Sequence, residues 1–100
     1  MIARHWRGVT RPERTDEYVE HLRRATIPEL TRIEGFVSAS IMRRPADGGV
    51  EFLVVTLWES VEAIARFAGP ELERAVVPDH VQRMMTEFDQ HVRHYEVVKI

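Results

Sequence analysis

The chain has 100 residues, of which 44% are hydrophobic and 30% charged, and it contains no cysteine. This length predicts one domain over residues 1–100, and the lack of cysteine excludes disulfides and thiolate chemistry. The formal net charge is −2, with acidic and basic residues interspersed, which argues against nucleic-acid binding because that function needs a basic patch. No apolar run approaches the roughly 20 residues that span a bilayer, and residues 1–10 lack a signal-peptide core, so we expect a cytoplasmic protein without membrane contact.

Hydrophobic periodicity and turn residues predict alternating strands and helices. Helix starts are indicated at Thr26, by capping-box spacing with a proline in the first turn, and at Ser60. Asp47-Gly48 is typical of a hairpin turn, and Gly69-Pro70 of a helix end. In chain order, the predicted elements are strand 2–9, helix 13–25, a short helical turn ending near Ile33, strand 36–44, strand 50–58, helix 61–68, helix 79–88 and strand 91–98.

This β-α-β-β-α-β order predicts an α+β, ferredoxin-like fold with a four-stranded antiparallel sheet, whose first and third strands are central. The strand at 50–58 is apolar on both faces. Its two faces carry Phe52, Val54 and Trp58 on one side, and Leu53, Val55 and Leu57 on the other. Helices cover only one face, so a second sheet is expected on the other. The sequence therefore predicts a homodimer through the sheet face, with a poorly covered monomer as the alternative.

No established catalytic motif is present: the chain lacks a glycine-rich phosphate loop, a nucleophile elbow and a zinc spacing. His91 and His94 would point to opposite faces of one strand, so they cannot share a metal ion. We therefore predict no metal site. Among the five histidines, His94 and His5 are the candidate bases, because the pKa of an unperturbed imidazole lies near neutral pH.

Two tryptophans mark the central strands. If these strands run parallel, Trp6 and Trp58 form one wall of a pocket that suits a flat hydrophobic ligand. The alternative is that each ring only packs in the core or in an interface.

Several segments together resemble the antibiotic biosynthesis monooxygenase-like family, and they are distributed over nearly the whole chain. They are IARHWRG near the start, LWES at 57–60, FAG at 67–69, AVVP at 75–78 and HYEVV at 94–98. The resemblance implies a dimeric α/β-barrel fold, in agreement with the dimer expected from the strand pattern. It also implies a cofactor-independent oxygenase that acts on an aromatic or quinol-type metabolite.

The same family contains heme-degrading monooxygenases, which this sequence disfavours. That branch uses an asparagine on the first strand, a tryptophan on the second helix and a histidine heme ligand after it. The chain contains no asparagine, and alignment on LWES places Phe67 and Val77 at the other two positions. We therefore expect no cofactor.

Three functions stay open. In an oxygenase, an electron-rich substrate in a dry pocket would itself reduce O₂, and the protein would supply a base, an aromatic cage and polar anchors. The alternatives are a non-catalytic, stress-related homodimer that binds a small hydrophobic ligand, and an interaction module without a pocket. The candidate residues are His94 and His5 as base, Trp6, Trp58 and Phe67 against the substrate ring, and Arg4, Arg43 and Tyr95 as anchors.

Overall fold

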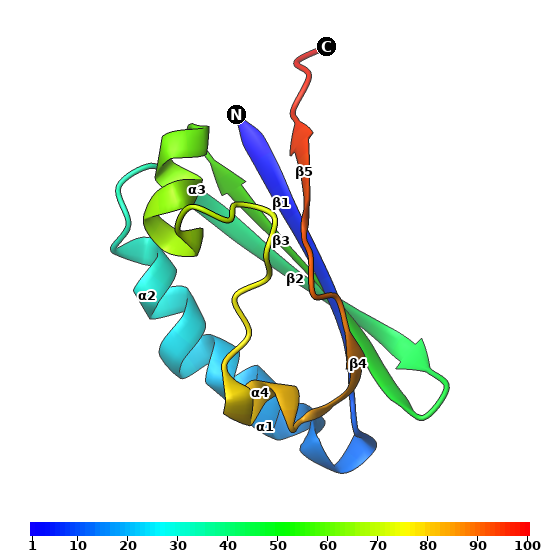
Figure 1. Cartoon of the computed structure of the whole chain (residues 1–100). Coiled ribbons are helices and arrows are strands. Elements are labelled where there is room, and N and C mark those ends of the chain that lie inside the picture. The colour runs from blue at the N-terminus through cyan, green and yellow to red at the C-terminus, as the bar shows by residue number, and fades with distance from the viewer.

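Helices cover one face of a twisted antiparallel sheet in the computed structural model, which describes all of residues 1–100 (Figure 1). The strands are β1 (Ile2–Thr10), β2 (Phe36–Ala46), β3 (Gly49–Trp58), β4 (Met85–Phe88) and β5 (Arg93–Glu96). The helical elements are the 3₁₀ turn η1 (Pro12–Arg14), α1 (Thr15–His21), the π turn η2 (Leu22–Thr26), α2 (Ile27–Thr31), α3 (Val61–Ala68) and α4 (Asp79–Gln82).

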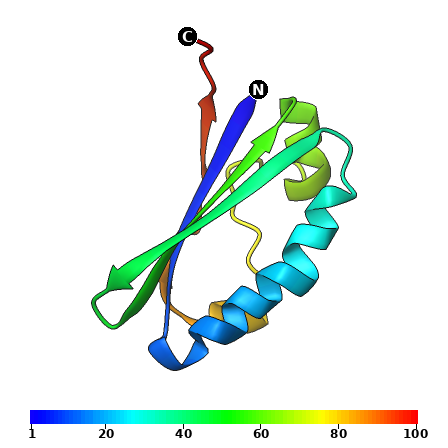
Figure 2. The same cartoon turned by 180° about the vertical axis from the view of Figure 1, so that it is seen from behind.

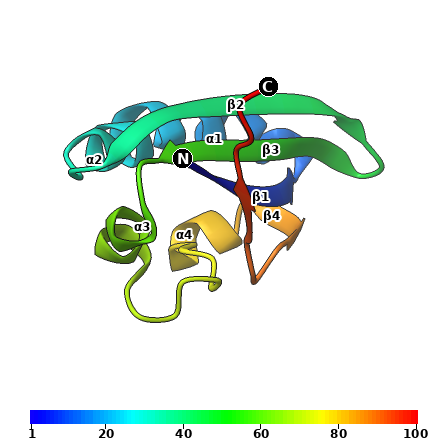
Figure 3. The ribbon, with the colours of Figure 1, turned by 90° about the horizontal axis from the view of Figure 1, so that it is seen from above.

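The sheet order is β2-β3-β1-β4, and β5 also pairs with β1 (Figure 3). Every pair is antiparallel, and β1 and β3 are central, so the predicted α+β ferredoxin-like class is confirmed. The condition under which Trp6 and Trp58 would form one wall, parallel β1 and β3, is not met. In the observed register Ile2 lies opposite Trp58 and Trp6 opposite Val54, so the two tryptophans share a face but lie several residues apart along the strands.

The last part of the chain differs from its prediction. The helix expected over 79–88 stops at Gln82, and Met85–Phe88 form β4 on the edge of β1. The sheet therefore has five strands instead of four, with β4 and β5 sharing one edge. The apolar spacing that suggested a helix is still used for burial, because Met84 and Met85 are each 3% exposed. Residues 85–88 form a strand because the backbone N–H and C=O groups on this edge of β1 would otherwise lack hydrogen-bond partners.

The helical run from Pro12 to Thr31 is continuous, so the predicted helix start at Thr26 is wrong. Thr26 has helical backbone angles and its side chain makes no capping bond. The π turn η2 lies just before Pro28, and the N–H of Ile27 bonds to the carbonyl of Leu22. Proline lacks an N–H and its ring crowds the carbonyl four residues earlier, and a widened turn accommodates both defects.

Other local signals give the expected structure. The Ser60 side chain accepts a hydrogen bond from the N–H of Ala63 (3.1 Å), so it caps α3. Gly69 ends that helix at φ +79°, and Gly48 turns the β2–β3 hairpin at φ +74°. Both angles lie in the left-handed region, where glycine has no Cβ penalty.

The core lies between the helices and what we call the inner face of the sheet, which carries Arg4, Trp6 and Trp58. One cluster centres on Phe52 with Tyr18 from α1, and the other on Trp58 with Leu30 from α2 and Ile64 from α3. Trp58 is 0% exposed, and its ring packs edge-on against Phe36 and stacks on Phe67.

The opposite, outer face of the sheet carries no helix, as the view from behind shows (Figure 2). Leu53, Val55 and Leu57 of β3 are only half-buried there. Beside them, Met42 and Tyr95 are each 48% exposed. The doubly apolar character of β3 is therefore real, and its outer side is left open in one chain. No helix of the protein combines the length and apolar character needed to cross a membrane.

Replacing Trp58 with alanine should lower the free energy of unfolding by about 3–5 kcal/mol, because it removes the largest fully buried side chain and leaves a cavity. Val61→Ala on the exposed side of α3 is the control and should change it by less than about 0.5 kcal/mol. Urea unfolding followed by circular dichroism measures both. Equal effects would contradict this account of the core.

Candidate functional site

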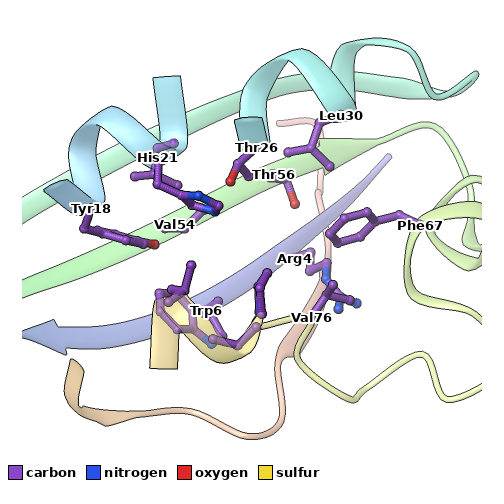
Figure 4. Close-up of a pocket in the computed structure, with 14 residues that line it drawn as sticks. Arg4, Trp6, Tyr18, His21, Thr26, Leu30, Val54, Thr56, Phe67 and Val76 are labelled. Carbon is purple, nitrogen blue, oxygen red and sulfur yellow. The ribbon is translucent and has the colours of Figure 1, made fainter. Parts of the chain in front are cut away.

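A cavity of about 90 Å³ lies between the inner face of the sheet, the helical run α1–η2–α2 and the segment that leads from α3 to α4 (Figure 4). Most of its lining is apolar. Its polar side chains are Arg4 and Thr56 from the sheet, and Tyr18, His21 and Thr26 from the helical run. A mostly apolar cavity with a few convergent polar groups is the usual form of a small-molecule site.

Aromatic rings from three elements form its walls: Trp6 of β1, Tyr18 of α1 and Phe67 of α3. The Trp6 and Tyr18 ring centroids are 6.4 Å apart. The Trp6 indole N–H donates to the carbonyl of Asp89 (2.9 Å). Gly8 is also required, because a Cβ there would overlap the Trp6 ring. These contacts hold the indole flat along the sheet.

Arg4 brings a positive charge into this apolar surrounding. Its residue exposure is 5%, and burial lowers its pKa to about 10, so the guanidinium stays charged at neutral pH. Nη1 donates to the carbonyl of Leu72 (2.6 Å) and Nη2 to that of Arg74 (3.0 Å). No carboxylate forms an ion pair with it, although seven other arginine–glutamate pairs are present. Arg4 is therefore a buried charge without a counter-ion.

His94 lies behind Arg4, on the neighbouring strand β5. Nη1 of Arg4 and Nε2 of His94 are 2.9 Å apart. Arginine only donates, so Nε2 must be the acceptor and the proton of the neutral ring is on Nδ1. Burial and then the charge of Arg4 lower the pKa of His94, while Glu73 acts in the opposite direction. The imidazole is neutral at pH 7, and its free lone pair is already engaged.

Tyr18 and His21 lie one helical turn apart and both face the cavity. Burial raises the pKa of the Tyr18 phenol, so it keeps its proton. Its hydroxyl makes no hydrogen bond to the protein. Every fully buried polar side-chain atom has a hydrogen-bond partner, so the Tyr18 hydroxyl oxygen is not fully buried and reaches the cavity. Nδ1 of His21 is 3.3 Å from Nε2 of His80. Burial and then His80 lower the pKa of His21, and Glu29 opposes them.

The sequence candidates divide between the two sides of the sheet. Arg4, Trp6 and Phe67 meet in the cavity. Trp58 lies behind Phe67 and His94 behind Arg4, and neither lines the cavity. His5 and Tyr95 lie on the outer face, where their rings contact each other with centroids 4.9 Å apart. Arg43 is exposed on β2. This division follows from strand geometry, since successive side chains point to opposite faces.

Sequence reasoning missed the helix contribution to the site. Neither Tyr18 nor His21 is among the site candidates from the sequence. Their spacing of three residues on one helix face was the available signal. Val77, aligned with the histidine ligand of the heme-degrading branch, does line the cavity, as does Phe67. No three histidine, aspartate or glutamate side chains converge on a possible metal position.

The family model described as "Antibiotic biosynthesis monooxygenase" matches residues 1–87. The chain belongs to this family. The resemblance drawn from the sequence segments is thus confirmed. No curated protein matches the sequence.

Solved structures agree on the fold of this antibiotic biosynthesis monooxygenase family member. A protein from Deinococcus radiodurans assigned to the same family is 19% identical, with a TM-score of 0.70 over 100% of this chain and 95% of that one. One from Bacillus cereus is 20% identical, with a TM-score of 0.65 over 99% and 92%. The heme-degrader MhuD of Mycobacterium tuberculosis, with two hemes bound in its active site, is 22% identical, with a TM-score of 0.55 over 98% and 97%. At these identities the likeness shows the shared fold.

The lowered pKa values of His21 and His94 predict a loss of stability in mild acid. The unfolded chain takes up these protons near the ordinary histidine pKa of about 6.5, whereas the folded chain takes them up only at lower pH. The free energy of unfolding should therefore fall between about pH 7.5 and pH 5.5. Urea titrations at the two pH values measure this change. His21→Gln and His94→Gln should each reduce the fall, and Val61→Ala, which removes no titratable group, should not; an unchanged fall in the first two variants would contradict the assignment.

Proposed function

We propose that this family member is a small cofactor-independent monooxygenase-like protein that acts on an aromatic or quinol-type metabolite in the cytoplasm. The observation that carries the proposal is the aromatic-walled cavity, in which Trp6, Tyr18 and Phe67 surround a buried cationic side chain. Such walls favour a planar ring. Family membership supports the class of reaction.

The proposed reaction draws its electrons from the substrate. A ring carbon of the ionised quinol that carries hydrogen is oxidised by one O₂; one oxygen atom enters the product at this carbon, and the other leaves as water with two hydrogens of the substrate, so that a hydroquinone gives a hydroxyquinone. The protein would exclude water, orient the ring and bind an anionic substrate. The positive charge of Arg4 suits the last role because it is buried without a counter-ion.

Two histidines are proposed as the base that removes the first substrate proton. His21 lines the cavity directly, and His94 reaches it only through Arg4. His5 lies on the outer face, and we assign it and its neighbour Tyr95 to a dimer contact instead.

O₂ uptake with a panel of anthrone- and hydroquinone-type substrates tests this function. Loss of a general base lowers turnover about 100-fold, so His21→Gln or His94→Gln should do so, while His91→Gln, outside the cavity, should not. Absence of O₂ uptake over the whole panel would refute the oxygenase, and equal rates in all three variants would refute the histidine base.

A second candidate is a non-catalytic protein that binds a small hydrophobic ligand. The observation in its favour is that both candidate bases are engaged: Nε2 of His94 accepts from Arg4, and Nδ1 of His21 is close to His80. Ligand-induced quenching of tryptophan fluorescence, without O₂ uptake or product, would distinguish this function from the first.

We also propose that a second copy of the chain covers the outer face of the sheet. Leu53, Val55 and Leu57 would be removed from water there, together with the exposed Met42 and Tyr95. Burying apolar area of this kind is the main driving force for association.

Light scattering should therefore give about twice the mass of one chain, as expected for a two-fold symmetric dimer. Val55→Asp, in the middle of the central strand β3, should give monomers or aggregates because it places a charge in the interface. Val61→Asp, on the exposed side of α3, is the matched control and should leave the mass unchanged. A monomeric wild-type protein would contradict the proposed dimer.

A further inference from the structure

The buried guanidinium of Arg4 has hydrogen-bonding capacity that the protein does not use. Arginine has five N–H donors. Three of them are taken by the carbonyls of Leu72 and Arg74 and by His94, which leaves Nε–H and one N–H of Nη2. Nε and Nη2 form one edge of the planar group, and this edge matches the two oxygens of a carboxylate.

The unused edge is open to the cavity. Every fully buried polar side-chain atom of the protein has a hydrogen-bond partner. Nε of Arg4 has no partner, so this atom is not fully buried. Arg4 is only 5% exposed in total, and it lines the cavity. The Nε–H donor is therefore reached from the cavity.

The surroundings of this edge favour an aromatic ring beside the anionic group. The Arg4 Cζ lies 5.7 Å from the centre of the Phe67 ring, and Trp6 lies two residues further along the same face of β1. Thr56 is directly opposite Arg4 in the strand register. Its hydroxyl accepts from the Trp58 indole (2.8 Å) and so still has its own proton to donate. The free Tyr18 hydroxyl offers another polar contact from the helical wall (Figure 4).

The size of the cavity limits the ligand to about one ring. Its volume is about 90 Å³. An apolar cavity of about 150 Å³ holds benzene, whereas sites for drug-sized ligands measure about 300–1,000 Å³. A single ring that extends toward the mouth fits this scale, and a larger ring system would project further out of the cavity.

We propose that the free Nε–Nη2 edge of Arg4 binds the carboxylate of a small hydroxylated aromatic acid, whose ring lies against Trp6 and Phe67. This inference rests on the proposed function, because it names the substrate class of the same cavity: a one-ring quinol that carries a carboxylate. The carboxylate neutralises Arg4 and is a binding handle, and the ring hydroxyls are the groups that face the helical wall.

Binding has a predicted effect on His94. In the free protein the charge of Arg4 disfavours a second proton on this ring, while Glu73 favours it. A bound carboxylate beside Arg4 adds negative charge, so the pKa of His94 should rise on binding. This response is a readout that does not depend on turnover.

The test is an anaerobic NMR titration of the full chain with benzoate and 4-hydroxybenzoate, and with benzamide as the neutral isostere. The protein has two indole N–H signals; the one from Trp6 should move and the one from buried Trp58 should move less. Benzamide should bind about 10- to 100-fold more weakly, the difference expected when charge-assisted hydrogen bonds are lost.

Variants separate the Arg4 edge from general positive charge. Arg4→Met should abolish the preference for benzoate over benzamide. Arg4→Lys should retain only part of it, because an ammonium group lacks the two coplanar N–H donors that bind both oxygens of a carboxylate. Arg66→Met, which removes an exposed arginine of α3, is the control and should bind like wild type. If Arg4→Met does not fold, the preference for benzoate over benzamide is compared between wild type and Arg4→Lys, and a smaller preference in Arg4→Lys supports the proposal.

Equal affinities for benzoate and benzamide in the wild type would overturn the inference, as would an equal loss of benzoate affinity in Arg4→Lys and Arg66→Met. Failure of the proposed function looks different. Tight benzoate binding without O₂ uptake from 2,5-dihydroxybenzoate would refute the oxygenase and support the ligand class. O₂ uptake from neutral hydroquinones, with no preference for the carboxylate-bearing ring, would support the oxygenase and overturn this inference.

Discussion

The hydrogen bonds of the buried Arg4 guanidinium connect parts of the chain that are far apart in sequence. They join the central strand β1 to the carbonyls of Leu72 and Arg74, and to His94 of β5. The segment after α3 is thus held close to the sheet, where it forms one wall of the cavity. The same group carries a charge that no carboxylate compensates, so stability and ligand chemistry depend on one side chain. A buried charge of this kind is costly unless it has partners, and an anionic ligand would be such a partner.

The alternation of side chains along β1 gives the two sides of the sheet separate roles. Arg4 and Trp6 point toward the helices, and His5 points away from them. The inner face therefore combines aromatic rings with the cation, and the outer face combines half-exposed aliphatic side chains. Because neighbours in sequence lie on opposite faces, a residue that suits the chemistry of one side cannot take part on the other. Cavity and proposed dimer surface thus share the same strands without sharing residues.

Local chemistry predicted much of the fold, and long-range pairing accounts for the failures. Local effects account for the correct predictions at Ser60, Gly69 and Asp47-Gly48. These residues act on their own backbone or on that of a near neighbour, so a short stretch of sequence is enough to predict their roles. Thr26 carried a similar signal, but the helix continues through Pro28 by means of a π turn. The apolar spacing at 79–88 fits a helix, and the free edge of β1 instead pairs with Met85–Phe88. Neither outcome is contained in the local pattern.

By itself, the sequence determined the order of elements as far as α4, the family and the doubly apolar strand β3, because these depend on periodicity, turn residues and motifs along the chain. It also placed Arg4, Trp6 and Phe67 among the site candidates. Only the tertiary structure decided which candidates meet: it brought Tyr18 and His21 into the cavity and placed His5 and Tyr95 on the other side of the sheet. It also showed that the lone pair of His94 is engaged by Arg4. The physical reason is that a site is a set of distances between elements, and the antiparallel register of β1 and β3, with the helices packed on one face, sets those distances.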